Sequence, residues 1–133
     1  MPNGNVRASA VVGSTLYVGG DFDFVGPPTG HGVPLDRTTG TAAAGFPAAN
    51  GNVATVVADG AGGWFLGGTF TTIGGVARAG LAHVTADLRV DPAFAPTPDN
   101  GVRALALAGG TLFVAGDFTS VSGVPRGGLA ALD

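Results

Sequence analysis

The sequence contains no Lys, Glu, Gln or Cys, and these absences exclude several kinds of protein at once. Straight-chain residues are strong helix formers, so their scarcity beside 25 Gly and 9 Pro argues against a helical fold. Without cysteine the chain has no disulfides, no thiolate chemistry and no Cys-ligated zinc. Charged residues make up only 11%, and the net charge of -3 is too small to steer the chain toward nucleic acid or an anionic membrane. We therefore expect neither nucleic acid nor a membrane as a partner.

Long apolar runs are also missing. None approaches the roughly 20 residues needed to span a bilayer, and the first five residues have neither a basic region nor an apolar core typical of a signal peptide. The chain as given is expected to be soluble. The lack of cysteine does not assign a compartment, because exported proteins can fold without disulfides.

One four-residue motif is present three times at a fixed spacing. It reads Gly19-Gly20-Asp21-Phe22, Gly67-Gly68-Thr69-Phe70 and Ala115-Gly116-Asp117-Phe118, which is a period of 48 residues. A period in this range, in a chain with little helix signal, indicates a radial or stacked β architecture.

Each repeat predicts the same series of strands. A first strand follows an Asn-Gly turn, for which we expect positive φ, and a second strand ends in the small-residue pair of the motif. After a loop comes a third strand, and a weaker fourth segment holds Phe46 in the first repeat and Phe94 in the second. The expected strands are 6–12, 15–18 and 33–35, then 53–58, 64–66 and 81–84, then 102–108, 111–114 and 129–132.

This pattern resembles a known class of repeat. Four strands with a Gly-Gly doublet ending the second are similar to the kelch type of β-propeller, and residues 112–126 resemble more closely the bacterial delta-60 repeat. Repeat two departs at Thr69, and repeat one departs in its loop at residues 26–31. The resemblance implies a binding or scaffolding module without catalytic residues, in an extracellular or cell-surface part of a bacterial protein.

The predicted fold is therefore all-β, with three β-propeller blades in a single partial propeller over residues 1–133. The blades span 3–49, 50–99 and 100–133, and the last lacks its outer strand. Propellers close with about 4 to 8 blades, and terminal repeats normally have polar caps that this sequence does not show. Either the chain is a piece of a longer propeller, or copies close a ring head to tail, where a dimer with six blades is favoured over a trimer with nine.

Four sets of residues have predicted structural roles. Matching phenylalanines should be buried, the last glycine of each pair should lie where backbone approaches closely, aspartates should accept bonds from turn amides, and arginines should tie loop carbonyls. They are Phe22, Phe70 and Phe118; Gly20, Gly68 and Gly116; Asp21 and Asp117; and Arg78 and Arg126.

No set of residues indicates catalysis, a cofactor or a metal. The Asp21-Phe22-Asp23 segment lacks the further oxygen ligands of a calcium loop, and His31 and His83 occupy unmatched positions without a nucleophile nearby in sequence. Trp64 aligns with a leucine in each of the other repeats, which favours the core over sugar stacking. A self-associating scaffold is the first functional hypothesis, a protein- or glycan-binding module is the second, and an enzyme is the third.

Overall fold

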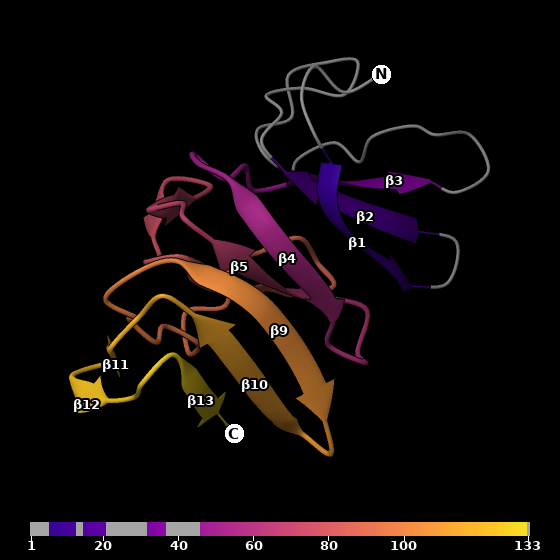
Figure 1. Cartoon of the computed structure of the whole chain (residues 1–133). Coiled ribbons are helices and arrows are strands. Elements are labelled where there is room, and N and C mark those ends of the chain that lie inside the picture. The colour runs from indigo at the N-terminus through magenta and orange to yellow at the C-terminus, as the bar shows by residue number, and fades with distance from the viewer. Residues whose placement is uncertain (1–5, 13–14, 21–31, 37–45, 133) are drawn as a thin grey trace.

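The computed structural model describes residues 6–12, 15–20, 32–36 and 46–132, and every regular element within these ranges is a β-strand. Three antiparallel sheets follow one another along the chain (Figure 1). The first contains β1 (Val6–Val12), β2 (Thr15–Gly20) and β3 (Gly32–Asp36). The second contains β4 (Val53–Ala58), β5 (Trp64–Gly68) and β8 (Leu81–Val84), and the third β9 (Val102–Ala108), β10 (Thr111–Gly116) and β13 (Leu129–Leu132).

The sheets lie face to face in chain order, and their first strands run side by side. Strand β4 contacts both β1 and β9, as Figure 1 shows at the centre of the molecule. The second sheet therefore uses one face for the first repeat and the other face for the third repeat. The described part of the chain contains no helix of the length and apolarity required to cross a bilayer.

Two apolar clusters fill the spaces between consecutive sheets. The first joins Tyr17 of β2 to Val53, Trp64 and Leu66 of the second repeat, and the second joins Leu81 to the third repeat. Phe70 and Phe118 are 2% and 1% exposed in these clusters. Phe22, the third of the matching phenylalanines, lies outside the described residues, as do Asp21 and His31.

In each of the second and third repeats, the loop after the second strand contains one short hairpin that the sequence pattern did not predict. They are β6 (Thr72–Ile73) with β7 (Val76–Ala77), and β11 (Ser120–Val121) with β12 (Val124–Pro125). Their turns have positive φ at Gly74 and Gly75 and at Ser122 and Gly123, the arrangement of a two-residue hairpin loop. The two hairpins bring the number of strands in the described residues to 13, four more than the nine expected ranges.

The Asn-Gly segments that open the second and third repeats are not turns with positive φ. Neither Gly51 nor Gly101 has positive φ. The side chain of Asn50 instead accepts hydrogen bonds from Thr71 N and Thr72 N at 2.8 and 2.9 Å, and Asp99 caps the equivalent amides in the third repeat. These side chains fix the start of each repeat to its own hairpin loop.

The fourth segment of the second repeat is shorter than a strand. Val90 forms a single bridge to Val84, and the residues around Phe94 do not extend this pairing. Leu88 and Val90 nevertheless pack against the first apolar cluster beside Phe46, so the segment covers the edge of β8.

We predict that Phe70→Ala and Phe118→Ala each lower the free energy of unfolding by about 3 to 5 kcal/mol, because each leaves a cavity between two sheets. Urea unfolding followed by fluorescence measures the change. Val76→Ala is the control, since this residue is 41% exposed and should change stability by less than about 0.5 kcal/mol. If both phenylalanine variants were as stable as Val76→Ala, Phe70 and Phe118 would not occupy equivalent buried sites that stabilise the fold.

Candidate interaction surface

One face of the third sheet is apolar and uncovered. It consists of Ala104, Ala106, Phe113, Ala115 and Leu129, which alternate along β9, β10 and β13 on the same side. Leu129 is 63% exposed and Phe113 is 42% exposed, and none of the five side chains is charged. We call this surface the open face.

The same face of the second repeat is covered. Leu81, at the position of Leu129, is fully buried, and Phe65, at the position of Phe113, packs against the second apolar cluster. In the first repeat Tyr17 occupies the Phe113 position and is also fully buried. In the first and second repeats, the surface that corresponds to the open face is covered by the repeat that follows.

A glycine allows this close packing in the first two repeats. A Cβ built on Gly19 would lie 2.6 Å from Val53 Cγ1, and one built on Gly67 would lie 2.6 Å from Val102 Cγ1. The third repeat has Ala115 at this position. Any occupant that places a valine here in the same way must move to accommodate the extra methyl group.

The second glycine of each pair has a different role. A Cβ on Gly68 would overlap the carbonyl oxygen of Asn52, and one on Gly116 would overlap that of Gly101. The close approach is thus within one repeat, and only the preceding glycine contacts the neighbouring sheet. Gly20 is buried at the matching position of β2, opposite Val6.

The side chains of β9 and β10 divide between the two faces of the third sheet. Val102, Leu105, Leu112 and Val114 belong to the cluster shared with the second repeat, whereas Ala106 and Phe113 point to the open side. Leu105 on β9 therefore packs inward, against the second repeat.

Asp117 does not bond turn amides as predicted. Its carboxylate accepts hydrogen bonds from Arg103 Nε at 2.9 Å and forms an ion pair with Arg103 Nη2 at 2.8 Å. The hydrogen bonds from Arg103 hold the pKa of Asp117 below its usual value. The pair is exposed, so its contribution to stability is small.

Arg78 and Arg126 contact loop carbonyls. Arg78 Nη1 donates to Ala77 O at 2.7 Å and its Nη2 donates to Asp91 O at 3.0 Å. Arg126 Nη1 donates to Pro125 O at 2.8 Å in the same manner. In the second repeat the guanidinium thus joins the hairpin loop to the fourth segment.

His83 ties three segments of the second repeat together. Its Nε2 lies 2.7 Å from Asp59 Oδ2 and its Nδ1 lies 2.9 Å from Asp91 Oδ2, and its ring stacks on Phe65 with centroids 4.4 Å apart. Since both ring nitrogens face carboxylates of the same chain, neither is free to act on a substrate. Sequence reasoning missed this tie, although the strand register places His83 opposite Phe65 at the end of the hairpin that leads from Asp59.

The hydrogen bonds with His83 lower the pKa values of both Asp59 and Asp91. Burial pushes the pKa of Asp59 upward, but hydrogen bonds from His83, Ala61 N and Gly63 N outweigh it and leave the pKa below its usual value. The hydrogen bond from His83 likewise lowers the pKa of Asp91. Within the described residues no group of three or more His, Asp, Glu or Cys side chains could hold a metal ion.

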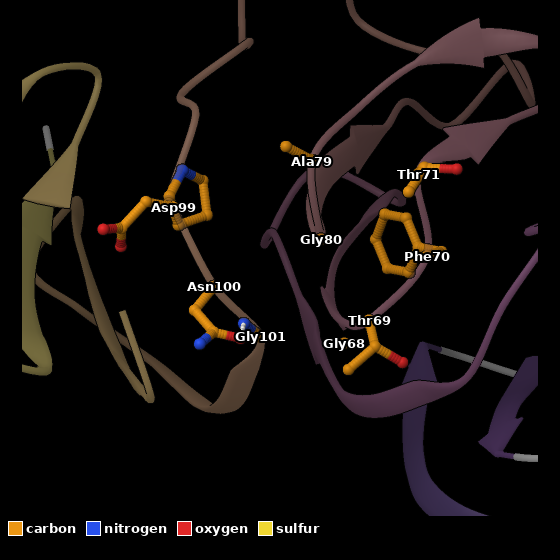
Figure 2. A pocket seen from close by; sticks show the side chains of 10 residues that line it. Gly68, Thr69, Phe70, Thr71, Ala79, Gly80, Asp99, Asn100 and Gly101 are labelled. Atoms are coloured by element: carbon orange, nitrogen blue, oxygen red, sulfur yellow. Dashed lines mark hydrogen bonds between the residues drawn. The ribbon is translucent and has the colours of Figure 1, made fainter. Parts of the chain in front are cut away.

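A shallow groove separates the second and third repeats at one end of the sheets. It has a volume of about 240 Å³ and is lined by residues 68–71, 79–80 and 98–101 (Figure 2). Three of its four polar side chains accept hydrogen bonds within the chain: Thr71 from Asn50 Nδ2, Asp99 from Thr119 N and Asn100 from Gly101 N. The groove is smaller than most small-molecule sites, and its aromatic residue, Phe70, is buried.

Comparisons with known proteins give one match. Residues 62–94 and 110–132 match the model of a β-propeller domain of unknown function (DUF5122), and the two segments begin one repeat apart. No curated protein and no solved structure matched the chain. With the all-strand structure, these matches confirm the all-β fold of propeller blades and support a β-propeller repeat family. The closer resemblance to delta-60 or kelch repeats stays a prediction.

We predict that His83→Ala destabilises the fold by about 2 kcal/mol at pH 6, because two carboxylates lose a hydrogen-bond partner. The pKa values of Asp59 and Asp91 are lowered from 3.8 in the folded state, so their stabilisation is present above pH 3.8 and is lost as the pH falls below it. The difference between wild type and variant should therefore shrink at pH 3.

Urea unfolding at both pH values measures this change. Asp87→Asn, which alters an exposed carboxylate, serves as the control. A difference between wild type and His83→Ala that is equal at pH 6 and pH 3 would show that the carboxylates do not depend on His83.

Proposed function

We propose that this protein is a non-enzymatic β-propeller scaffold that closes a ring by head-to-tail association, with the open face of one copy covered by the first repeat of another. The observation that supports this proposal is the contrast between Leu129, 63% exposed, and its buried equivalent Leu81. Burial of large apolar side chains is the main favourable term in protein association, and soluble monomers rarely expose contiguous apolar surface.

The backbone register of the first repeat supports its role as the partner surface. Val6 pairs with Gly20 as Val102 pairs with Gly116, so Val6 stands where Val53 and Val102 stand in the repeats that cover their predecessors. Ser9 is exposed at the position of Val56 and Leu105. The contact joins two different surfaces, and such heterologous contacts close into rings when the rotation allows.

The number of repeats favours a dimer. Two copies would bring together six repeats, inside the common range of about 4 to 8 blades, whereas three copies would exceed it. A further repeat of a longer chain could cover the same face, and the molar mass in solution distinguishes this reading from self-association. The protein- or glycan-binding alternative has weaker support, because the groove of Figure 2 is small and most of its polar side chains are already bonded.

We predict that the chain has about twice its monomer mass of 12.9 kDa by light scattering at micromolar concentration, and that Leu129→Asp returns it to the monomer mass. The aspartate would place an unpaired charge in the centre of the buried contact. Val124→Asp is the matched control, since Val124 is 46% exposed but lies on the β11–β12 hairpin. A monomeric wild type, or equal masses for wild type and Leu129→Asp, would contradict ring closure.

We further predict that Ala115→Gly strengthens the dimer about fivefold or more, because it removes the methyl group that would crowd Val6 of the second copy. Analytical ultracentrifugation gives the dissociation constants. The control is Gly67→Ala, which should weaken folding of the single chain, because the added methyl would crowd Val102. Weaker association of Ala115→Gly would mean that the partner does not place a valine on this position.

A further inference from the structure

The second and third repeats both begin with an Asn-Gly dipeptide, but the two dipeptides stand one position apart. Val53 and Val102 occupy the same position, since each pairs with the last glycine of its hairpin. In this alignment Asn50 corresponds to Asp99, and these are the two side chains that cap the hairpin loops. Asn100 stands one residue later, so the capping role in the third repeat belongs to its neighbour.

The carboxamides of the two asparagines make different hydrogen bonds. Asn50 Oδ1 accepts from Thr71 N and Thr72 N, and its Nδ2 donates to Thr71 Oγ1 at 2.8 Å, so both ends of the group are fixed to the hairpin loop. Asn100 Oδ1 accepts instead from Gly101 N, the amide directly after it, at 2.8 Å. Asn100 is exposed and lies at the groove of Figure 2. Its carboxamide is therefore held against the next backbone nitrogen, where water can reach it.

This geometry matters because asparagine is chemically labile. The backbone nitrogen that follows an asparagine can attack the side-chain carboxamide, and the reaction is fastest when glycine follows, since glycine has no side chain to shield its nitrogen. Holding two reacting groups in contact raises the rate of a reaction between them. The hydrogen bond from Gly101 N keeps the nucleophile beside Asn100, whereas the bonds to the hairpin loop restrain the carboxamide of Asn50.

We propose that Asn100 is a site of spontaneous deamidation in the folded protein, and that the hydrogen bonds of Asn50 protect the other dipeptide. After Gly101 N loses its proton to base, it forms a bond to Asn100 Cγ, the Cγ–Nδ2 bond breaks, and ammonia leaves with a proton from water. Water then opens the five-membered imide. Addition at Cγ gives aspartate, and addition at the main-chain carbonyl carbon gives isoaspartate. The reaction takes place within one chain, so it does not depend on ring closure.

Isoaspartate at position 100 would change the start of β9. It leads the main chain through the side-chain carbons and so inserts one methylene group before Gly101. Gly101 O accepts a hydrogen bond from Asp117 N at 2.9 Å, and the next residue, Val102, is 1% exposed and lies on the backbone of Gly67. The extra methylene group displaces Val102 from this position. Deamidation therefore loosens the contact between the second and third repeats.

The test compares the two dipeptides in one molecule. The full-length protein is kept at pH 8 and 37 °C and digested with trypsin, which leaves Asn50 in the peptide 38–78 and Asn100 in the peptide 90–103. Liquid chromatography with mass spectrometry detects the added mass and separates isoaspartyl from aspartyl peptides. We expect Asn100 to react at least about tenfold faster than Asn50, because only its carboxamide is held against the nucleophile. In guanidinium chloride, where both are released, the rates should become similar.

Asn100→Gln is the matched control, because it keeps an exposed carboxamide on a side chain too long to form the five-membered ring. After the same incubation, the urea midpoint of the wild type should fall in proportion to its isoaspartate content, and that of Asn100→Gln should not change. Three results would overturn the proposal. They are equal rates for Asn50 and Asn100 in the folded protein, a rate difference that persists in guanidinium chloride, and an isoaspartyl fraction that unfolds at the midpoint of fresh protein.

Discussion

The whole structure depends on one contact, in which the first strand of each following sheet packs on the face of the sheet before it. Gly19 and Gly67 have no side chains, so Val53 and Val102 lie directly on the backbone of the preceding repeat. Each repeat is a single small sheet that cannot bury both of its faces alone. The apolar clusters, the buried phenylalanines and the order of the sheets all follow from repeating this contact.

Within the described residues, the second repeat meets two requirements that the third repeat does not. A sheet needs a neighbour for its face, which is a matter of apolar area, and it needs a partner for its outer strand, which is a matter of backbone hydrogen bonds. Leu129 and Phe113 represent the first requirement, and β13 with Arg126 represents the second.

The sequence alone predicts the repeat, its period and most of the strands, because turn residues and alternating apolar residues are local signals. It does not show which neighbour each residue contacts. Leu105 and Phe113 are similar in sequence terms, yet one faces the second repeat and the other faces outward, because β9 and β10 pair in a register that only the folded sheet defines. The tie between His83, Asp59 and Asp91 is equally hidden, since it joins residues from three separate segments. The β6–β7 hairpin, in contrast, has a local Gly-Gly signal in its turn, where both residues have positive φ.

The third repeat departs from the second at polar positions beside the open face. Where the second repeat has His83 and Asp59, the third has Ala131 and Ala108, so the polar tie between strands is absent from this part of the third repeat. Without such groups, the open face offers only its shape and its apolar area, and apolar surfaces discriminate weakly between ligands of similar size. The methyl group of Ala115 adds a steric condition, because a methyl group at the equivalent glycines would crowd the valine of the next repeat. In the dimer that we propose, the side chain placed opposite Ala115 would therefore decide how closely the two copies approach.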